Sequence, residues 1–305
     1  MSEQRRRTQA FVLGGGGARG ALQVGALRAL LEAGIQPDML VGTSIGAANA
    51  AFLATFGPSP ETIARLERTW HSAAQADLLP ANYLRLTLRL LLNRSTSQIE
   101  QHIRDYLIEQ GLDPELRFGD LDGPRLFLVA ADLSSGSLTI HGSDPAQSVL
   151  EAVLASTALP PWVRPLQRGD GLLMDGGIVS NLPIEPALSQ GATEIIALDL
   201  ADSRPVGLGI GNLGAFLFHL GHTIQQRQVQ LEKQIAAQRD VPVYHIRLRA
   251  ESPVAVWQFA EAPALFELGY ELARAYLADH PELGQEEPQQ PWWQRLRLAL
   301  GKPAR

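Results

Sequence analysis

Short apolar runs that end at glycine alternate, in the first part of the chain, with longer segments typical of helices. The runs lie at residues 11–13 and 38–42. Between the two runs, the apolar positions of residues 21–33 recur at helical spacing. After the second run, the alanine-rich residues 45–56 also predict a helix. A strand, helix, strand, helix order predicts a parallel sheet with helices on its faces. The expected fold class is therefore α/β.

The alternation continues to about residue 280. It predicts further strands at 125–133, 137–141, 171–174, 193–200 and 241–248, and helices over 61–110, 147–156, 213–238 and 263–278. Residues 281–291 are rich in Glu, Gln and Pro, a composition typical of a tether. We therefore expect one domain over residues 8–280, followed by a tether and a basic amphipathic segment over residues 281–305.

Composition and charge exclude several classes of protein. The chain has 305 residues, 45% of them hydrophobic, which is ample for a large core. With 26 basic and 32 acidic side chains, the formal net charge is −6, and no global basic field favours nucleic acid as a partner. The absence of cysteine excludes thiolate catalysis and cysteine-ligated metals. The apolar run at 10–13 is too short for a signal peptide, and we expect a cytoplasmic protein.

A Gly-x-Ser-x-Gly pattern places Ser44 between a predicted strand and a predicted helix, with Gly42 and Gly46 on either side. This is the context of a nucleophile elbow, in which a sharp bend exposes the serine hydroxyl and brings the flanking backbone too close for a Cβ atom. The alternative is a tight turn whose serine only caps the following helix. The pattern by itself does not decide between them.

A glycine-rich loop at residues 14–20 also lies between a strand and a helix. Successive glycines let backbone N–H groups point at one anionic centre, such as the oxyanion of acyl transfer. Arg19 could add charge to this loop, pin it, or form a surface salt bridge. The spacing of Gly15, Gly17 and Gly20 also matches a dinucleotide fingerprint, which requires an acidic residue at the end of the second strand. That strand ends instead at Gly42, which disfavours a dinucleotide.

A serine nucleophile needs a base, and Asp175 is the strongest candidate. It follows a predicted strand directly and precedes two glycines, so its carboxylate should lie at a sheet edge beside a sharp turn. The alternative is a turn aspartate that bonds its own backbone. His219, His222 and His245 follow Asp175 in the order of an α/β-hydrolase triad, but none is a convincing third member, because each also suits packing or capping.

These motifs together resemble the bacterial patatin-like phospholipases over residues 10–200. Four segments carry the resemblance in order: Gly-Gly-Gly-Ala-Arg-Gly at 15–20, Gly-Thr-Ser-Ile-Gly at 42–46, Ala-Ser-Thr-Ala-Leu-Pro at 155–160, and Asp-Gly-Gly at 175–177 with Asn-Leu-Pro at 181–183. The 155–160 and 181–183 segments suggest no chemistry, and we expect them to pack around the site. The resemblance implies a three-layer α/β/α sandwich with a mainly parallel central sheet.

The resemblance also implies a Ser–Asp dyad that cleaves acyl esters, chiefly of phospholipids, without a metal or other cofactor. Ser44 would be the nucleophile and Asp175 the general base. The oxyanion hole would be formed by the loop of Gly15, Gly16, Gly17, Ala18, Arg19 and Gly20, and the turns would be supported by Gly42, Gly46, Gly176 and Gly177. The alternative function is a catalytically silent regulatory protein of the same fold that binds lipid or acyl groups.

Three segments could bring such an enzyme to lipid. Residues 78–93 alternate leucines with arginines and suit a lid, a lipid-facing helix or a core helix. Residues 205–226 carry no charge, which suits a buried or lipid-touching segment better than a membrane span. Residues 292–300 form a basic amphipathic segment that could contact the inner membrane surface peripherally, or dock on protein. The sequence leaves these alternatives, and the oligomeric state, open.

Overall fold

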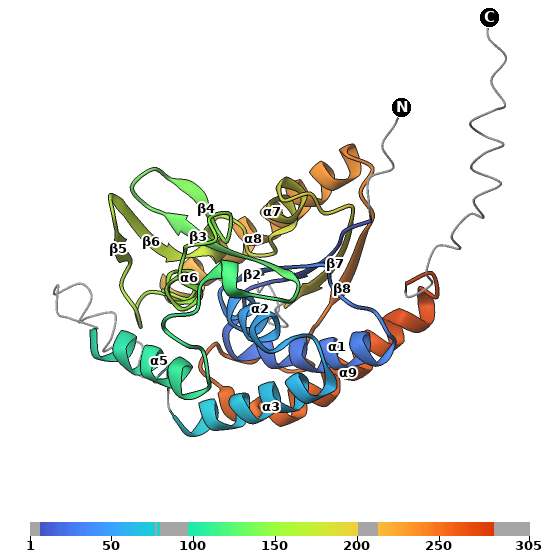
Figure 1. The fold of residues 1–305 in the computed structure, drawn as a ribbon, viewed down its shortest axis with the longest axis horizontal. Coiled ribbons are helices and arrows are strands. Elements are labelled where there is room, and N and C mark those ends of the chain that lie inside the picture. The colour runs from blue at the N-terminus through green and yellow to red at the C-terminus, as the bar shows by residue number, and fades with distance from the viewer. Residues whose placement is uncertain (1–6, 77, 80–96, 201–212, 284–305) are drawn as a thin grey trace, which may run out of the picture.

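The computed structural model describes residues 7–76, 78–79, 97–200 and 213–283 (Figure 1). Within these residues, one sheet contains eight strands in the order β5-β6-β3-β2-β1-β7-β8, and β4 pairs with β3 beside this path. The strands are β1 (Gln9–Leu13), β2 (Met39–Thr43), β3 (Arg125–Asp132), β4 (Ser137–His141), β5 (Leu166–Arg168), β6 (Gly171–Asp175), β7 (Glu194–Asp199) and β8 (Val243–Arg247). The pairs β1–β2, β2–β3, β1–β7 and β7–β8 are parallel, which confirms a mainly parallel sheet.

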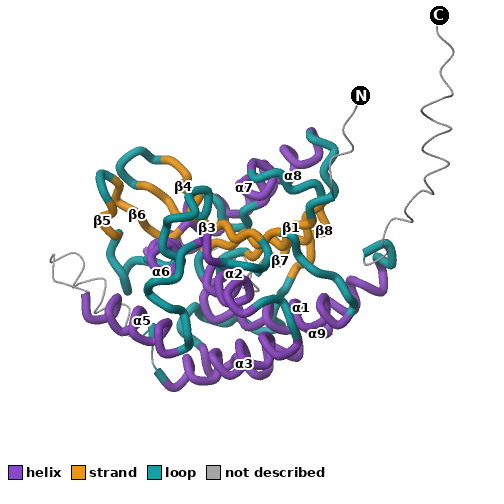
Figure 2. The backbone as a smooth tube through the Cα atoms, in the orientation of Figure 1, coloured by secondary structure: helices purple, strands orange, loops and turns teal. Residues whose placement is uncertain are grey.

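Helices cover both faces of this sheet (Figures 1 and 2). The α-helices are α1 (Ala21–Glu32), α2 (Ile45–Phe56), α3 (Pro60–Gln75), α5 (Ser97–Glu109), α6 (Val149–Ser156), α7 (Ile184–Ser189), α8 (Leu213–Gln238) and α9 (Ala262–Asp279). Short 3₁₀ turns are η1 (Gly17–Gly20), η2 (Phe118–Asp120), η3 (Gly176–Ile178) and η4 (Phe259–Glu261). Helices α7 and α8 lie on one face, opposite α1, α2, α3 and α9.

The alternation of side chains along β1 explains these three layers. Phe11 and Leu13 point into the larger core, which they share with α1, α2, α3 and α9. Ala10 and Val12 point to the other face and pack with side chains of α7 and α8. Because successive strand residues face opposite sides, a fully buried strand needs helices on both. The predicted α/β/α sandwich is confirmed.

Helices α1 and α9 cross in backbone contact. A Cβ atom on Gly25 of α1 would lie 1.9 Å from the carbonyl oxygen of Phe266, and one on Gly269 of α9 would lie 2.0 Å from that of Leu22. No side chain fits at either distance. These two glycines therefore fix how closely α9 packs on α1.

Most of the predicted elements are confirmed, with small shifts at their ends. Two short elements were not predicted: β5, which exists by pairing with β6, and α7, which follows a proline turn. The prediction of helix throughout residues 61–110 was wrong at Leu78 and Leu79, which lie in a bend beyond the end of α3. Their apolar side chains had suggested a continuous helix, but they instead enter the larger core.

The segments predicted to touch lipid lie partly or wholly outside the described residues. The parts outside are residues 80–93 of the segment 78–93, residues 205–212 of the segment 205–226, and the whole C-terminal segment 292–300. None of the helices among the described residues combines the length and apolar character needed to cross a bilayer.

The α1–α9 crossing gives a stability prediction. Replacement Gly25→Ala should destabilise the fold by about 1–3 kcal/mol, because the added methyl must displace the α9 backbone. Gly221→Ala is the matched control: Gly221 also lies within a helix, but its Cβ would meet no atom within 4 Å. That variant should be neutral, or stabilised by up to about 1 kcal/mol through helix propensity. Urea unfolding measures both, and equal destabilisation of the two would contradict the proposed contact.

Candidate active site

Ser44 occupies a strained bend between β2 and α2. Its backbone has φ 55° and ψ −126°, a conformation that is unfavourable for a residue with a side chain. The surrounding backbone allows no side chains: a Cβ on Gly46 would lie 2.2 Å from the Leu13 carbonyl oxygen, and one on Gly42 would lie 2.5 Å from that of Gly46. Glycine is therefore needed on both sides of the serine, because Gly46 packs against β1 and Gly42 packs against the first turn of α2.

The register of three strands brings Asp175 to Ser44. Thr43 of β2 pairs with Val129 of β3, so Ser44 is level with Ala130. Further along the same edge of β3, Ala130 pairs with Asp175, the last residue of the antiparallel strand β6, while β4 pairs with the opposite edge. The carboxyl ends of β2 and β6 therefore meet end to end. The Ser44 hydroxyl donates a 2.6 Å hydrogen bond to Asp175 Oδ2, and the Gly177 amide donates a 2.8 Å bond to Oδ1.

Burial makes Asp175 a stronger base than an ordinary aspartate. The residue is 4% exposed. Loss of hydration raises the pKa of its carboxyl from 3.8 to about 6, although the hydrogen bonds from Ser44 and Gly177 act in the opposite direction. At neutral pH the carboxylate is therefore largely ionised, while its affinity for a proton is much higher than in water.

The glycine loop lies directly beside the serine. A Cβ on Gly15 would be 3.0 Å from Ser44 Cβ. Three of the loop amides are already used. Gly14 N–H donates to the Leu198 carbonyl at 3.2 Å, and Gly15 N–H and Ala18 N–H donate to the carbonyls of Asn181 and Val256, both at 2.9 Å. Within the described residues, the amides of Gly16 and Gly17 have no hydrogen-bond acceptor. These two are the loop amides that could serve an oxyanion.

The remaining predicted loop and turn residues have packing roles. Arg19 Nε donates a 3.2 Å bond to the Gly16 carbonyl, so this side chain pins the loop. Gly20 lies against Ile45 at the start of α2, where a Cβ would be 2.6 Å from the isoleucine side chain. Gly176 lies against β3, where a Cβ would be 2.3 Å from the Val129 carbonyl oxygen.

Ser156 supports the bend in a way that sequence reasoning missed. Its buried hydroxyl accepts a 2.9 Å bond from the Ser44 amide and donates a 2.6 Å bond to the Val129 carbonyl. The 155–160 motif had been assigned to packing alone. A serine within this largely apolar stretch is the sequence signal for such a bond, because a buried hydroxyl needs a hydrogen-bond partner.

A second buried carboxylate, Glu232 of α8, lies behind the site and was not predicted. It accepts a 2.6 Å bond from the Ser180 hydroxyl and a 2.9 Å bond from the Glu185 amide at the start of α7. The Ser180 carbonyl in turn accepts a 2.8 Å bond from the Thr43 hydroxyl, one residue before Ser44. Burial raises the pKa of Glu232 to about 7. Glu232 therefore anchors the 180–183 segment, which joins α8 to the serine bend.

Among the described residues, none of the three candidate histidines is a hydrogen-bond partner of the Asp175 carboxylate. His245 of β8 contacts Asp199 Oδ2 at 2.8 Å, and β8 is three strands away from β2. His222 contacts Gln226 within α8, and His219 accepts a bond from Thr223 through its carbonyl oxygen. In the described part of the chain, the hydrogen-bond partners of the Asp175 carboxylate are Ser44 and Gly177.

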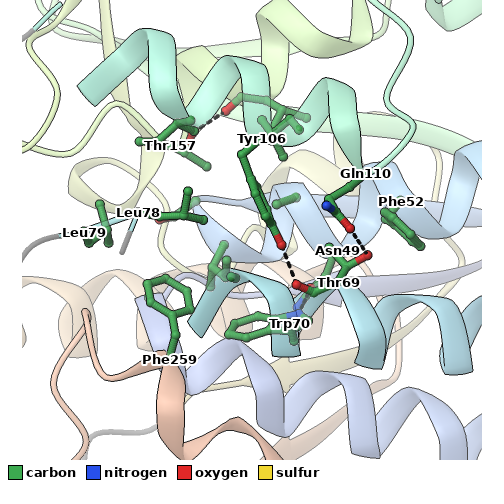
Figure 3. Close-up of a pocket in the computed structure, with 18 of the residues that line it drawn as sticks. Asn49, Phe52, Thr69, Trp70, Leu78, Leu79, Tyr106, Gln110, Thr157 and Phe259 are labelled. Atoms are coloured by element: carbon green, nitrogen blue, oxygen red, sulfur yellow. Dashed lines mark hydrogen bonds between the residues drawn. The ribbon is translucent and has the colours of Figure 1, made fainter. Parts of the chain in front are cut away.

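An apolar pocket begins at Ser44 and extends between α2, α3 and α5 (Figure 3). It encloses about 1060 Å³, including the part that opens to solvent. Along α2 its wall is formed in succession by Ser44, Ala48 and Phe52, which lie one helical turn apart. Thr69 of α3 bonds to two residues across the gap: the Tyr106 hydroxyl of α5 donates to its carbonyl, and its own hydroxyl donates to Gln110 Oε1 just beyond α5 (Figure 3). The pocket can accommodate an extended hydrocarbon chain next to the serine.

The fold and the site define an α/β protein with a serine on a sharp bend between a strand and a helix. The patatin-like phospholipase family matches residues 11–188, and the chain belongs to this family. It is 35% identical to mouse patatin-like phospholipase domain-containing protein 7 over 63% of this chain and 13% of that protein. It is 30% identical to lysophospholipase NTE1 of Mycosarcoma maydis over 65% of this chain and 10% of that protein. The chain thus spans a small part of these relatives. Family membership supports a lipid hydrolase function in general.

Among solved structures, VipD from Legionella pneumophila matches 90% of this chain and 67% of its own, with 16% identity and a TM-score of 0.47.

The raised pKa of Glu232 predicts a pH-dependent stability difference. The pKa of Glu232 is 4.5 in the unfolded chain and about 7 in the folded protein. The resulting contribution to the free energy of unfolding is fully present below pH 4.5 and is lost as the pH rises through about 7. Glu232→Gln removes the ionisation. Between pH 5 and pH 8, its free energy of unfolding should therefore rise relative to the wild type by about 2–3 kcal/mol.

Urea unfolding of both proteins at the two pH values measures this difference, and the shift of Asp175 cancels because both proteins retain it. Glu251→Gln, at an exposed position, is the control and should show a much smaller change. A pH-independent difference between Glu232→Gln and the wild type would refute the argument.

Proposed function

We propose that the chain is a serine acyl hydrolase of phospholipase A or lysophospholipase type, in which Ser44 and Asp175 form a catalytic dyad. The observation that carries this proposal is the 2.6 Å bond between Ser44 Oγ and Asp175 Oδ2 at the start of an apolar pocket. Nucleophile and base within hydrogen-bond distance are the minimal arrangement for acyl transfer.

In the first half of the reaction, Ser44 Oγ attacks the ester carbonyl carbon while its proton passes to Asp175 Oδ2. The amides of Gly16 and Gly17 would donate to the oxyanion of the tetrahedral intermediate. Such donors act strongly because they are already oriented before the reaction. The carbon–oxygen bond to the alcohol then breaks, and the leaving oxygen takes the proton from Asp175. An acyl-Ser44 intermediate remains.

In the second half, a water molecule replaces the alcohol. Asp175 accepts a proton from this water, whose oxygen attacks the acyl-Ser44 carbonyl. The intermediate collapses by breaking the bond to Ser44 Oγ, which recovers the proton from Asp175. The products are a free fatty acid and the regenerated serine, and every proton transfer uses the same carboxylate.

The pocket supports a lipid rather than a polar ester as substrate. Its wall is formed mainly by aliphatic and aromatic side chains from α2, α3 and α5. An acyl chain inside it would place its ester carbonyl at the Ser44 end. The name of the fungal relative, a lysophospholipase, is consistent with this substrate class. The alternative, a silent lipid-binding protein, shares the pocket but predicts no turnover.

Substitution of the dyad tests the proposal. Ser44→Ala and Asp175→Asn should each reduce hydrolysis of p-nitrophenyl butyrate by roughly a thousandfold or more, because each removes a group that acts in the bond-breaking steps. Ser189→Ala, which loses a bond within α7, is the control and should keep its activity. A fluorophosphonate should label the wild type but not Ser44→Ala.

Two outcomes would overturn this assignment in different ways. Activity retained in Ser44→Ala would exclude the acyl-serine mechanism. A folded wild-type protein that hydrolyses no soluble or lipid ester, yet binds fatty acid, would instead favour the silent binding protein.

The pocket wall predicts chain-length selectivity. Ala48 lies one turn after Ser44 and lines the pocket, so Ala48→Phe should block the space beyond the ester. We expect kcat/KM for p-nitrophenyl palmitate to fall roughly tenfold or more, while the value for the acetate ester changes little. The acetate ester is the internal control for folding and chemistry. Equal loss on both esters would mean that the acyl chain does not occupy this pocket.

A further inference from the structure

Exposed apolar side chains gather on one part of the described surface. Four of the most exposed large apolar residues belong to α8: Phe216 (41% exposed), Leu220 (46%), Ile224 (44%) and Leu231 (42%). A fifth, Ile178 (52%), lies in the η3 turn that follows Asp175. We call these five residues the α8 apolar face. Isolated exposed apolar residues are ordinary, but a contiguous group marks a surface for interaction.

The helix geometry makes this group a single stripe. At 3.6 residues per turn, the four α8 positions fall within about 80° of the helix circumference. Glu232 and Ala236 are buried on another side of the same helix. Gln228 connects the stripe to the turn, because its side chain donates a 2.7 Å bond to the Ile178 carbonyl. The stripe and Ile178 therefore form one surface.

Charge on this surface favours an anionic partner. The chain carries a net charge of −6, yet no acidic residue occurs between Asp202 and Glu232. Glu232 itself is buried. The exposed Arg227 falls within the arc of the stripe, between Ile224 and Leu231. A helix face that combines apolar residues with arginine and lacks acidic residues is typical of binding in the interface of a membrane with anionic lipids.

The surface is also adjacent to the candidate catalytic turn. Ile178 follows Asp175 by three residues, and Gln225 of α8 donates a 3.4 Å bond to the Gly177 carbonyl. A membrane in contact with α8 would therefore lie close to the dyad. A second copy of the chain fits less well, because the face has no acidic groups to complement Arg227.

We propose that the α8 apolar face docks onto the surface of an anionic phospholipid membrane and thereby brings the dyad to its substrate. The inference rests on the proposed function for its choice of lipid as partner. The apolar side chains would enter the region between headgroups and acyl chains, while Arg227 would contact lipid phosphates. This contact is reversible and needs no membrane-spanning helix.

Vesicle sedimentation tests the docking independently of catalysis. The Ser44→Ala protein, which leaves the lipid intact, is mixed with vesicles of phosphatidylcholine containing phosphatidylserine. We expect a combined Phe216→Ser, Leu220→Ser and Ile224→Ser variant to bind at least roughly fivefold more weakly. Arg227→Gln should weaken binding to the anionic vesicles and reduce its sensitivity to salt. Leu133→Ser is the matched control, since Leu133 is 44% exposed but lies outside α8.

A second measurement separates failure of this inference from failure of the proposed function. With Ser44 present, the triple variant should hydrolyse a soluble p-nitrophenyl ester as the wild type does, while losing activity on vesicle phospholipid. Two binding results would overturn the docking. One is unchanged vesicle binding by the triple variant, and the other is no vesicle binding by the Ser44→Ala protein that keeps the α8 apolar face. A dimer that the triple substitution dissociates would also overturn it, because the face would then bind a second copy. The turnover of a soluble ester by Ser44→Ala tests only the dyad: retained turnover would contradict the proposed function and leave the vesicle-binding result unaffected.

Discussion

The end-to-end alignment of β2 and β6 along one edge of β3 is the constraint on which the site depends. Ser44 and Asp175 are 131 residues apart in sequence, and they meet because both are level with Ala130. A shift of one residue in either pairing would turn one side chain to the other face of the sheet. Ser156 reinforces the register, since its hydroxyl bridges the Ser44 amide and the Val129 carbonyl. The strained serine bend is thus held by β-sheet pairing and by a buried side chain at once.

The same packing explains why so many motif residues are glycines with no chemical role. Gly46 lets α2 start against β1, Gly42 lets the end of β2 lie against the first turn of α2, and Gly176 lets the η3 turn start against β3. Gly15 is close enough to Ser44 to bring the loop beside the nucleophile. The loop shape then depends on backbone bonds to Asn181 and Val256 and on the contact with Arg19. Among the described residues, the amides of Gly16 and Gly17 have no acceptor and could face a ligand.

Local patterns in the sequence were sufficient to predict the central strands, the serine bend, the glycine loop and the turn at Asp175. Each of these is encoded within a few residues by apolar periodicity or by glycine. The strand β5 and helix α7 are too short to carry such periodicity, and β5 depends on β6 for its hydrogen bonds. Glu232 could not be predicted, because only the packing of α8 on the sheet buries it. The pocket likewise requires α3 and α5 to be placed against α2, which is a tertiary property.

The proposed dyad contains one carboxylate, and its hydrogen-bond partners in the described part of the chain include no cation. When Ser44 attacks and Asp175 takes its proton, the negative charge moves from the carboxylate to the oxyanion, and the total charge of the site does not change. Burial disfavours the charge where it starts, as the raised pKa of Asp175 reflects. Oriented amides at Gly16 and Gly17 favour the charge where it ends. In the proposed mechanism, burial of the base and the open amides of the loop would therefore lower the barrier of the same step from opposite ends, and an aspartate would thereby replace the histidine of a triad.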